Sequence, residues 1–289
     1  MVRENGVHGV ERRGVGQLQY EHDHEPTPGG PAARAGPVQS PGMTIVGVPA
    51  GWPATEEEAR AVQDELRGRV VLDEPGPPPG TGRVTGVDVA YDDGLDLVAA
   101  AAVVLDAATL DVVAEATAVG RVSFPYVPGL LAFREIPTVR AALDRLPCPP
   151  GLVVCDGYGL AHPRRFGLAS HLGVLTDLPT VGVAKNPFTF TYDDPGPARG
   201  SSAPLLAGAE EVGRALRTRD GVKPVFVSVG HRVSLGNALA HTLALTPRFR
   251  LPETTRRADA LCRRALREAA QGLTGDGAQD STTRQAPTS

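Results

Sequence analysis

Apolar residues follow two patterns between residues 43 and 270. In the first part, three strand-like apolar runs follow one another across short turns rich in Asp and Gly, which predicts an antiparallel meander. Farther along, segments with helical spacing alternate with short, wholly apolar runs that are typical of buried parallel strands. The meander strands are expected at 84–91, 97–105 and 111–122, the later strands at 151–155, 179–185 and 223–230, and the helices at 55–70, 130–146, 167–176, 234–245 and 253–269.

This order of elements predicts an α/β fold. Three antiparallel strands followed by parallel strand–helix units form a mixed central sheet that is flanked by helices. The order is that of the ribonuclease-H-like fold. Because one fold hosts many functions, the functional argument has to come from particular residues.

Composition changes at both ends of the chain. Residues 25–42 are rich in Pro and Gly and have no periodicity, so we expect 1–42 to be a disordered tail. An ordinary globular sequence begins at Met43, which is our hypothesis for the true start of the protein. Residues 271–289 are small and polar, and we expect a second disordered tail there. One folded domain is therefore predicted over 43–270.

The cysteines and the apolar runs indicate in which cellular compartment we expect the protein. Cys148, Cys155 and Cys262 are odd in number and lack CxxC spacing, which argues against a disulfide framework or a zinc knuckle. A reducing, cytoplasmic location fits this usage. No apolar run reaches the roughly 18 residues of a membrane span, and the N-terminus has no signal-peptide core. We expect no contact with membranes.

The formal net charge of -4 hides an asymmetry. Residues 43–211 contain 12 basic and 22 acidic residues, whereas 212–268 contain 12 basic and 4 acidic ones. The basic part predicts a face that follows a phosphate backbone, and the alternative is a set of solvated helix faces. The residues expected on this face are Arg214, Arg217, Arg219, Lys223, Arg232, Arg248, Arg250, Arg256 and Arg257.

Three acidic residues occupy positions that are unusual for a charged side chain or typical of ligand binding. Asp88 lies inside an apolar strand, Asp156 ends another, and Glu135 lies on the helix between them. A charge inside a strand needs a partner or a metal, and ligands collect at strand ends in such sheets. The alternatives are that Asp88 pairs with a core arginine, Asp156 is a turn residue and Glu135 lies on the surface.

If the three acids converge, their chemistry points to hard cations. Carboxylate oxygens suit Mg²⁺, with Mn²⁺ as a substitute. Two such ions can activate a water and clamp the attacking and leaving oxygens of a phosphodiester. The pattern therefore predicts a metal-dependent phosphodiesterase.

Two longer segments make the prediction specific. Residues 124–135 read FPYVPGLLAFRE, and residues 155–171 read CDGYGLAHPRRFGLASH. Both resemble hallmark segments of the endonuclease V family, the deoxyinosine-specific repair nucleases. Further blocks resemble the family in the same order, so that the resemblance covers about 55–265. They are GVDVAY at 86–91, VGVAK at 181–185, GHRVSL at 230–235 and RLPETTRRAD at 250–259.

The resemblance implies a role for each matching polar residue. Asp88, Glu135 and Asp156 match the metal-binding acids of the family. His162 and Lys185 match residues near the cleaved strand. An ammonium close to the scissile phosphate would stabilise developing negative charge, and a histidine there would bind phosphate or transfer a proton. The alternatives are a helix-capping role for Lys185 and a purely loop-stabilising role for His162.

The resemblance also implies how the lesion is recognised. Tyr126, held between two prolines, matches a wedge that enters the duplex beside the lesion. Gly129, Leu131 and Gly157 match the backbone of the pocket for the flipped hypoxanthine base, and an unstable inosine pair lowers the cost of flipping. The alternatives are a buried anchor for Tyr126 and a tight turn for Gly157.

The implied activity is cleavage of the second phosphodiester bond 3′ to a deoxyinosine, leaving 3′-hydroxyl and 5′-phosphate ends. The alternatives are an inosine-specific endoribonuclease, a lesion-binding protein that does not cut, and a nuclease without base selectivity. We expect a monomeric protein whose partner is DNA, with inosine-containing RNA as the other candidate.

One position departs from the family pattern. Some members carry a histidine near the metals on the last helix, and Ala260 stands close to that place here. The neighbouring Asp259 is either a fourth ligand or a partner of Arg256. Thr254 stands where a proline is common.

Overall fold

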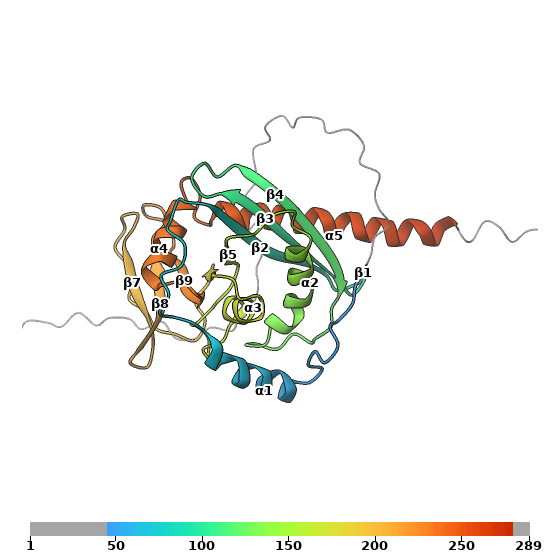
Figure 1. The fold of residues 1–289 in the computed structure, drawn as a ribbon, viewed down its shortest axis with the longest axis horizontal. Coiled ribbons are helices and arrows are strands. Elements are labelled where there is room, and N and C mark those ends of the chain that lie inside the picture. The colour runs from blue at the N-terminus through green and yellow to red at the C-terminus, as the bar shows by residue number, and fades with distance from the viewer. Residues whose placement is uncertain (1–44, 280–289) are drawn as a thin grey trace, which may run out of the picture. The chain divides into compact units, whose positions relative to one another are not determined.

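A mixed sheet forms the centre of the molecule (Figure 1). The computed structural model describes residues 45–279, and within them nine strands pair in the order β1-β4-β3-β2-β5-β6-β9-β8-β7. The strands are β1 (Ile45–Val46), β2 (Arg83–Asp92), β3 (Leu97–Asp106), β4 (Val112–Arg121), β5 (Leu152–Cys155), β6 (Thr180–Ala184), β7 (Ser202–Ala207), β8 (Glu210–Leu216) and β9 (Val225–His231). The predicted tail at 1–42 lies outside the described residues.

Strand directions confirm the predicted fold class. β2, β3 and β4 form an antiparallel meander, and β5 and then β6 add to β2 in parallel. β9, β8 and β7 continue the sheet beyond β6 in antiparallel fashion. The core order β4-β3-β2-β5-β6 is that of the ribonuclease-H-like fold.

Helices cover both faces of the sheet (Figure 1). α4 and α5 pack on the face that carries Val84, Val103 and Val154, and α2 and α3 pack on the face that carries Val87 and Val153. The helices are α1 (Glu56–Leu66), which a short 3₁₀ turn extends, α2 (Ala132–Asp144), α3 (Leu168–Thr176), α4 (Leu235–Ala244) and α5 (Glu253–Gln279). None of the described helices is long and apolar enough to cross a membrane.

The predicted cap of α1 is confirmed. Thr55 accepts a hydrogen bond from the backbone N–H of Glu58, and the Glu58 carboxylate accepts one from the backbone N–H of Thr55. This reciprocal pair satisfies two backbone donors that a helix start leaves free. The capping pair therefore defines the residue at which α1 begins.

Glycine brings α5 unusually close to the sheet. A Cβ added to Gly86 on β2 would lie 2.2 Å from the carbonyl carbon of Thr254, in the first turn of α5. Only a residue without a side chain allows this approach. Since side chains alternate along a strand, Asp88 faces the same helix.

Two expectations about elements differ from the structure. The β7–β8 hairpin was not predicted, because its Ala, Leu and Pro residues lack the β-branched pattern of the other strands. α5 continues to Gln279 instead of ending near 269, so residues 271–279 are helical where we expected a disordered tail. Alanines at 265, 269 and 270 favour that continuation.

Candidate active site

The site begins where β5 stops and β2 continues. Val87 on β2 pairs with Cys155, the last residue of β5. The next residues on the two parallel strands are Asp88 and Asp156, so pairing brings the two carboxylates side by side. The sheet therefore places two of the three predicted acids together.

Lys185 joins these acids from the end of β6. Its Nζ atom lies 2.6 Å from Oδ2 of Asp156. Partial burial opposes its charge, but the carboxylates of Asp156 and Asp88 outweigh burial and raise the pKa of Lys185. Lys185 is therefore a fixed cation in the site, and it does not cap a helix as the alternative proposed.

Asp88 is partly buried between the sheet and α5. Burial and the nearby Asp156 carboxylate raise its pKa well above the usual range, and Lys185 only partly compensates. Its Oδ1 atom accepts a hydrogen bond of 2.8 Å from the backbone N–H of Val89. The charges of Asp156, Lys185 and Asp259 act on Asp88, and Arg263 on the facing helix pairs with Asp259. No arginine among the described residues forms an ion pair with Asp88, so the core-pair alternative is wrong.

Glu135 reaches the site from the first turn of α2. It is 6% exposed, so the alternative of a surface residue is wrong. Burial raises its pKa to about 8, with a smaller contribution from Asp156, while the Tyr91 hydroxyl opposes the shift. That hydroxyl donates a hydrogen bond of 3.2 Å to Oε1 of Glu135. Tyr91 was not among the predicted site residues.

The first turn of α2 has its own support. Pro137 lies inside this helix and has no N–H to donate to the carbonyl of Phe133. The indole Nε1–H of Trp52 donates to that carbonyl at 2.9 Å instead. A side chain from the N-terminal segment thus holds the turn that carries Glu135.

Asp259 on α5 is a fourth acid of the site. Its charge acts on both Asp88 and Lys185. Its Oδ1 atom accepts a hydrogen bond of 2.8 Å from Arg263, and not from Arg256 as one alternative had it. We call Asp88, Glu135, Asp156 and Asp259 the carboxylate cluster.

The donor set of the carboxylate cluster fits a divalent cation. Its carboxyl groups lie in one region around Cys155 and α5, and burial together with the Asp156 and Asp259 carboxylates raises the pKa of Asp88. Oxygen-only ligands of this kind suit Mg²⁺. As the side chains stand, no three His, Cys, Asp or Glu residues of the described chain are grouped to hold one ion. Glu135, Asp156 and Asp259 are instead bonded to Tyr91, Lys185 and Arg263.

Tyr126 lies on the loop that leads into α2. It is 49% exposed, so the alternative of a buried anchor is wrong. Phe124, two residues earlier, is 2% exposed and anchors the loop. Gly129 ends the loop at a φ of +84°, where any side chain would be strained, and its carbonyl accepts a hydrogen bond from Gln63. The loop thus presents one aromatic ring on a fixed base.

The remaining predicted residues flank the same region. Leu131 directly precedes α2, four residues before Glu135, and Gly157 follows Asp156 directly at a φ of +153°. His162 is buried against Gly129, and burial lowers its pKa to about 4. The charges that act on His162 are those of Arg164 and Arg165, so its surroundings differ from the carboxylate cluster.

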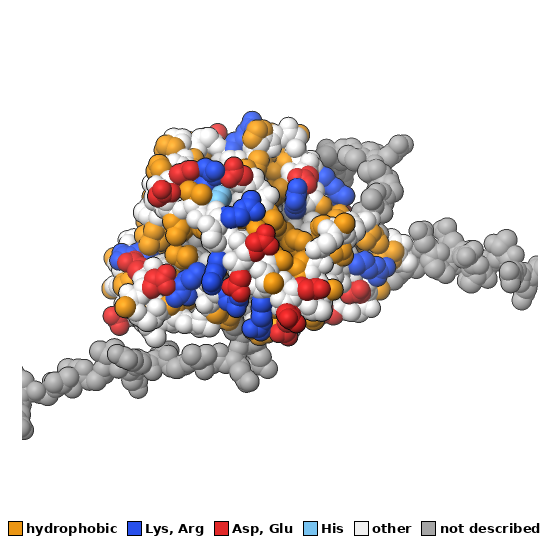
Figure 2. Space-filling model, turned by 60° about the horizontal axis from the view of Figure 1, so that its bottom comes forward, with side chains coloured by type: hydrophobic (Ala, Val, Ile, Leu, Met, Phe, Trp, Pro, Cys, Tyr) orange, Lys and Arg blue, Asp and Glu red, His pale blue; other side chains and the backbone are white. Residues whose placement is uncertain are grey.

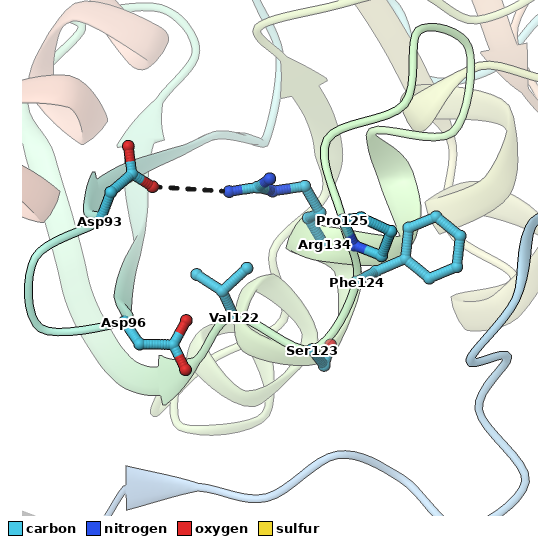
Figure 3. Close-up of a pocket in the computed structure, with 7 residues that line it drawn as sticks. All are labelled: Asp93, Asp96, Val122, Ser123, Phe124, Pro125 and Arg134. Carbon is cyan, nitrogen blue, oxygen red and sulfur yellow. Dashed lines mark ion pairs between the residues drawn. The ribbon is translucent and has the colours of Figure 1, made fainter.

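A hollow of about 400 Å³ lies beside the Tyr126 loop (Figure 3). Arg134 on α2 crosses it to form an ion pair of 3.8 Å with Asp93, and Asp96 and Pro125 also line it. The guanidinium of Arg134 lies 4.9 Å from the centre of the Tyr91 ring. This side of the site is therefore braced by Arg134 and Tyr91 together.

Several arginines of the predicted basic face are bonded to other groups of the protein. Arg217 is 6% exposed and donates to the carbonyls of Pro195, Gly196 and Val222. Arg232 pairs with Asp177, and Arg214 pairs with Glu211. The prediction of a phosphate-following role is therefore wrong for Arg217, because its donors are taken up by backbone.

The surface as seen in Figure 2 carries basic and acidic side chains close together, with apolar ones between them. It shows no broad area of one sign. On this face, the basic side chains are not gathered into a single stripe.

Comparison with known proteins decides the family. The sequence profile described as Endonuclease V matches residues 64–260. This chain belongs to the endonuclease V family. Endonuclease V of Streptomyces coelicolor is 88% identical over 230 residues, which are 79% of this chain and 99% of that protein.

Solved endonuclease V structures agree with the fold. That of Streptomyces avermitilis is 85% identical, has a TM-score of 0.77, and aligns with 78% of this chain and 100% of its own. Endonuclease V of Ciona intestinalis is 29% identical with a TM-score of 0.65, over 74% of this chain and 98% of its own. It was solved with a 24-mer DNA containing an inosine followed by a ribo-adenosine. Family membership makes this chain a nuclease.

Proposed function

We propose that this chain is a DNA repair endonuclease that recognises deoxyinosine, the product of adenine deamination. In this proposal it hydrolyses the second phosphodiester bond 3′ to the lesion and leaves 3′-hydroxyl and 5′-phosphate ends. The observation that carries the proposal is the carboxylate cluster with Lys185, at the carboxyl ends of the central strands β5 and β6 of a ribonuclease-H-like sheet. The Ciona relative, which binds inosine-containing DNA, supports the choice of lesion.

Asp88, Glu135 and Asp156 would hold Mg²⁺, or Mn²⁺ in its place, and Asp259 is positioned to add a fourth carboxylate. A bound ion of this kind supplies Lewis-acid activation of water and stabilises charge on the departing oxygen. The protein contributes the arrangement of the oxygens. Asp88 is fixed by the β2–β5 pairing, and Glu135 by Tyr91 and the first turn of α2.

Lys185 would stabilise negative charge that develops on the phosphate. Its ammonium is already held in the site by Asp156, so it needs no large movement to act. The ring of His162 is buried against Gly129, which leaves little of it to contact the strand. We assign His162 to shaping the pocket loop.

Tyr126 would act as the wedge. Its exposure leaves the ring free to enter a duplex, and the buried Phe124 anchors the loop so that the ring is held in place. Insertion of a ring unstacks neighbouring bases at a cost of a few kcal/mol, which is lowest for a weakly paired base such as inosine. The flipped base would then meet backbone at Gly129, Leu131 and Gly157.

The proposal is tested by incision of a labelled duplex with one deoxyinosine. Wild-type protein with Mg²⁺ should nick the strand at the second bond 3′ to the lesion and leave the undamaged duplex intact. Equal cutting of both duplexes would mean a nuclease without base selectivity. Binding without cutting in Mg²⁺ and in Mn²⁺ would mean a lesion-binding protein.

An RNA-directed activity is the second candidate. The DNA bound by the Ciona relative carries a ribonucleotide directly after the inosine, which makes a 2′-hydroxyl at that position relevant. Matched DNA and RNA strands with one inosine, assayed at equal concentration, separate the two candidates. Faster incision of the RNA would favour the ribonuclease.

A further inference from the structure

The loop between α4 and α5 presents a second exposed aromatic ring. Phe249 keeps 38% of its surface exposed. The guanidinium of Arg256, on the first turns of α5, lies 3.4 Å from the centre of this ring. Phe249 therefore has a cation against one face while part of its surface remains in water. Such a ring offers a base or sugar a stacking surface with a positive charge directly behind it.

This ring is tied to the catalytic residues. Arg250, the next residue, donates to the carbonyl of Lys185 at 2.5 Å, of Pro224 at 2.9 Å and of Lys223 at 3.0 Å. Lys185 is the residue whose ammonium holds Asp156. The hydrogen bonds of Arg250 thus hold the loop against the backbone of the site, and Phe249 is the residue next to Arg250.

The local charge favours a polyanion as the partner. Residues 246–257 contain the four arginines Arg248, Arg250, Arg256 and Arg257 and the single acid Glu253. Glu253 lies within 3.4 Å of Arg256 and 3.9 Å of Arg257. One carboxylate does not neutralise these cations, so the segment keeps a positive excess beside the acidic cluster. An aromatic ring within positive charge is the combination that binds nucleic-acid strands.

We propose that Phe249 and Arg256 form a stacking platform for the nucleic-acid strand that passes the catalytic cluster. The ring stacks on a base or sugar, and the guanidinium contributes positive charge near the backbone. This platform is separate from Tyr126, which lies on the loop before α2, and it rests on the proposed function because it requires a nucleic-acid substrate. Stacking of this kind tolerates any base, so the platform serves undamaged and damaged strands alike.

Fluorescence anisotropy of labelled 24-mer duplexes, with and without one deoxyinosine, tests the platform in buffer with EDTA. Phe249→Ala should raise the Kd for both duplexes by about 5- to 150-fold, the range for loss of one base–aromatic stack. Phe249→Trp should retain affinity. Its added emission, measured against the single native Trp52, should be quenched by the duplex. Leu72→Ala, which removes another exposed apolar side chain, is the matched control and should bind as wild type.

Different results overturn different claims. If Phe249→Ala binds as wild type, or Phe249→Leu restores binding as fully as Phe249→Trp, the ring only anchors its loop and the platform is wrong. If wild type neither binds the duplexes nor incises the deoxyinosine duplex with Mg²⁺, the proposed function fails together with the platform. If wild type incises with Mg²⁺ but binds neither duplex in EDTA, only the platform is wrong. A melting temperature for Phe249→Ala close to that of wild type shows that lost binding is not lost folding.

Discussion

At the scale of single residues, Tyr91 shows how the fold orients an acid of the candidate site. Its hydroxyl donates to Glu135, and Arg134 packs over its ring. Tyr91→Phe keeps the ring and removes the hydroxyl, so Glu135 loses its fixed orientation. We expect the Mg²⁺ concentration for half-maximal incision to rise by about 10- to 100-fold, as for other residues that orient metal ligands. A Mg²⁺ titration of incision measures this, and an unchanged midpoint would show that Tyr91 does not position Glu135.

His171 offers a prediction about pH. Its ring is fully buried among Trp52, Phe133 and Phe166, and neither ring nitrogen has a hydrogen-bond partner. Burial lowers its pKa from 6.5 to about 3. Between these two values the unfolded chain binds a proton that the folded chain does not, so acid favours unfolding.

The free energy of unfolding should therefore fall as the pH drops below about 6.5, with His171 contributing up to about 1.4 kcal/mol per pH unit. His171→Leu should remove this contribution and flatten the dependence between pH 6 and 4. Urea unfolding of both proteins across that range makes the comparison. Parallel curves for wild type and variant would show that His171 is not the group responsible.

The sequence pointed to the acids of the candidate site and to Lys185, but not to Tyr91, the partner of Glu135. Asp88 and Asp156 could be predicted as site residues because carboxylates are rare in apolar strands. Tyr91 could not, because an aromatic residue at the end of an alternating strand looks like core. Only the folded arrangement shows that its hydroxyl meets Glu135 from another element.

At the scale of elements, the contact between β2 and α5 controls the spacing of the cluster. Gly86→Ala would place a methyl group 2.2 Å from the backbone of Thr254, and backbone cannot rotate away as a side chain can. We expect the free energy of unfolding to fall by about 1–3 kcal/mol, as in other overpacked cores. Incision should fall as well, because α5 carries Asp259 and Asp88 faces that helix.

Gly236→Ala is the matched control for this substitution. A Cβ at Gly236, on the exposed side of α4, meets no atom within 4 Å. Alanine there should stabilise the helix by roughly 0.5–1 kcal/mol. Thermal melting of both variants gives the comparison, and equal melting temperatures would mean that the β2–α5 contact adapts without strain.

Helices and strands were predicted correctly where their apolar residues follow a single spacing. The meander, the buried strands β5 and β6 and most helix positions followed from apolar spacing alone. The β7–β8 hairpin did not, because its Ala, Leu and Pro residues lack the β-branched pattern of the other strands, and it joins the sheet only through the pairing of β8 with β9. Likewise, the small and polar residues after 270 did not reveal that α5 continues.

At the scale of the whole molecule, the curated relatives match only part of the chain. The two Streptomyces proteins match along 99% of their own length but only 78% and 79% of this one. We predict that a variant beginning at Met43 has the incision rate and melting temperature of the full chain. Side-by-side incision and melting curves test this, and a clear loss in either would assign a role to residues 1–42.

The central claim is that the carboxylate cluster performs incision at deoxyinosine. The most direct measurement is the single-turnover incision rate of wild type and Asp88→Asn on a deoxyinosine duplex, with Mg²⁺ and with EDTA. Asp144→Asn, an exposed acid on α2, is the control. We predict incision by wild type and Asp144→Asn only with Mg²⁺, and a loss of at least about 1,000-fold in Asp88→Asn, or roughly 4 kcal/mol of transition-state stabilisation. Full activity of Asp88→Asn, or undiminished incision in EDTA, would contradict the account.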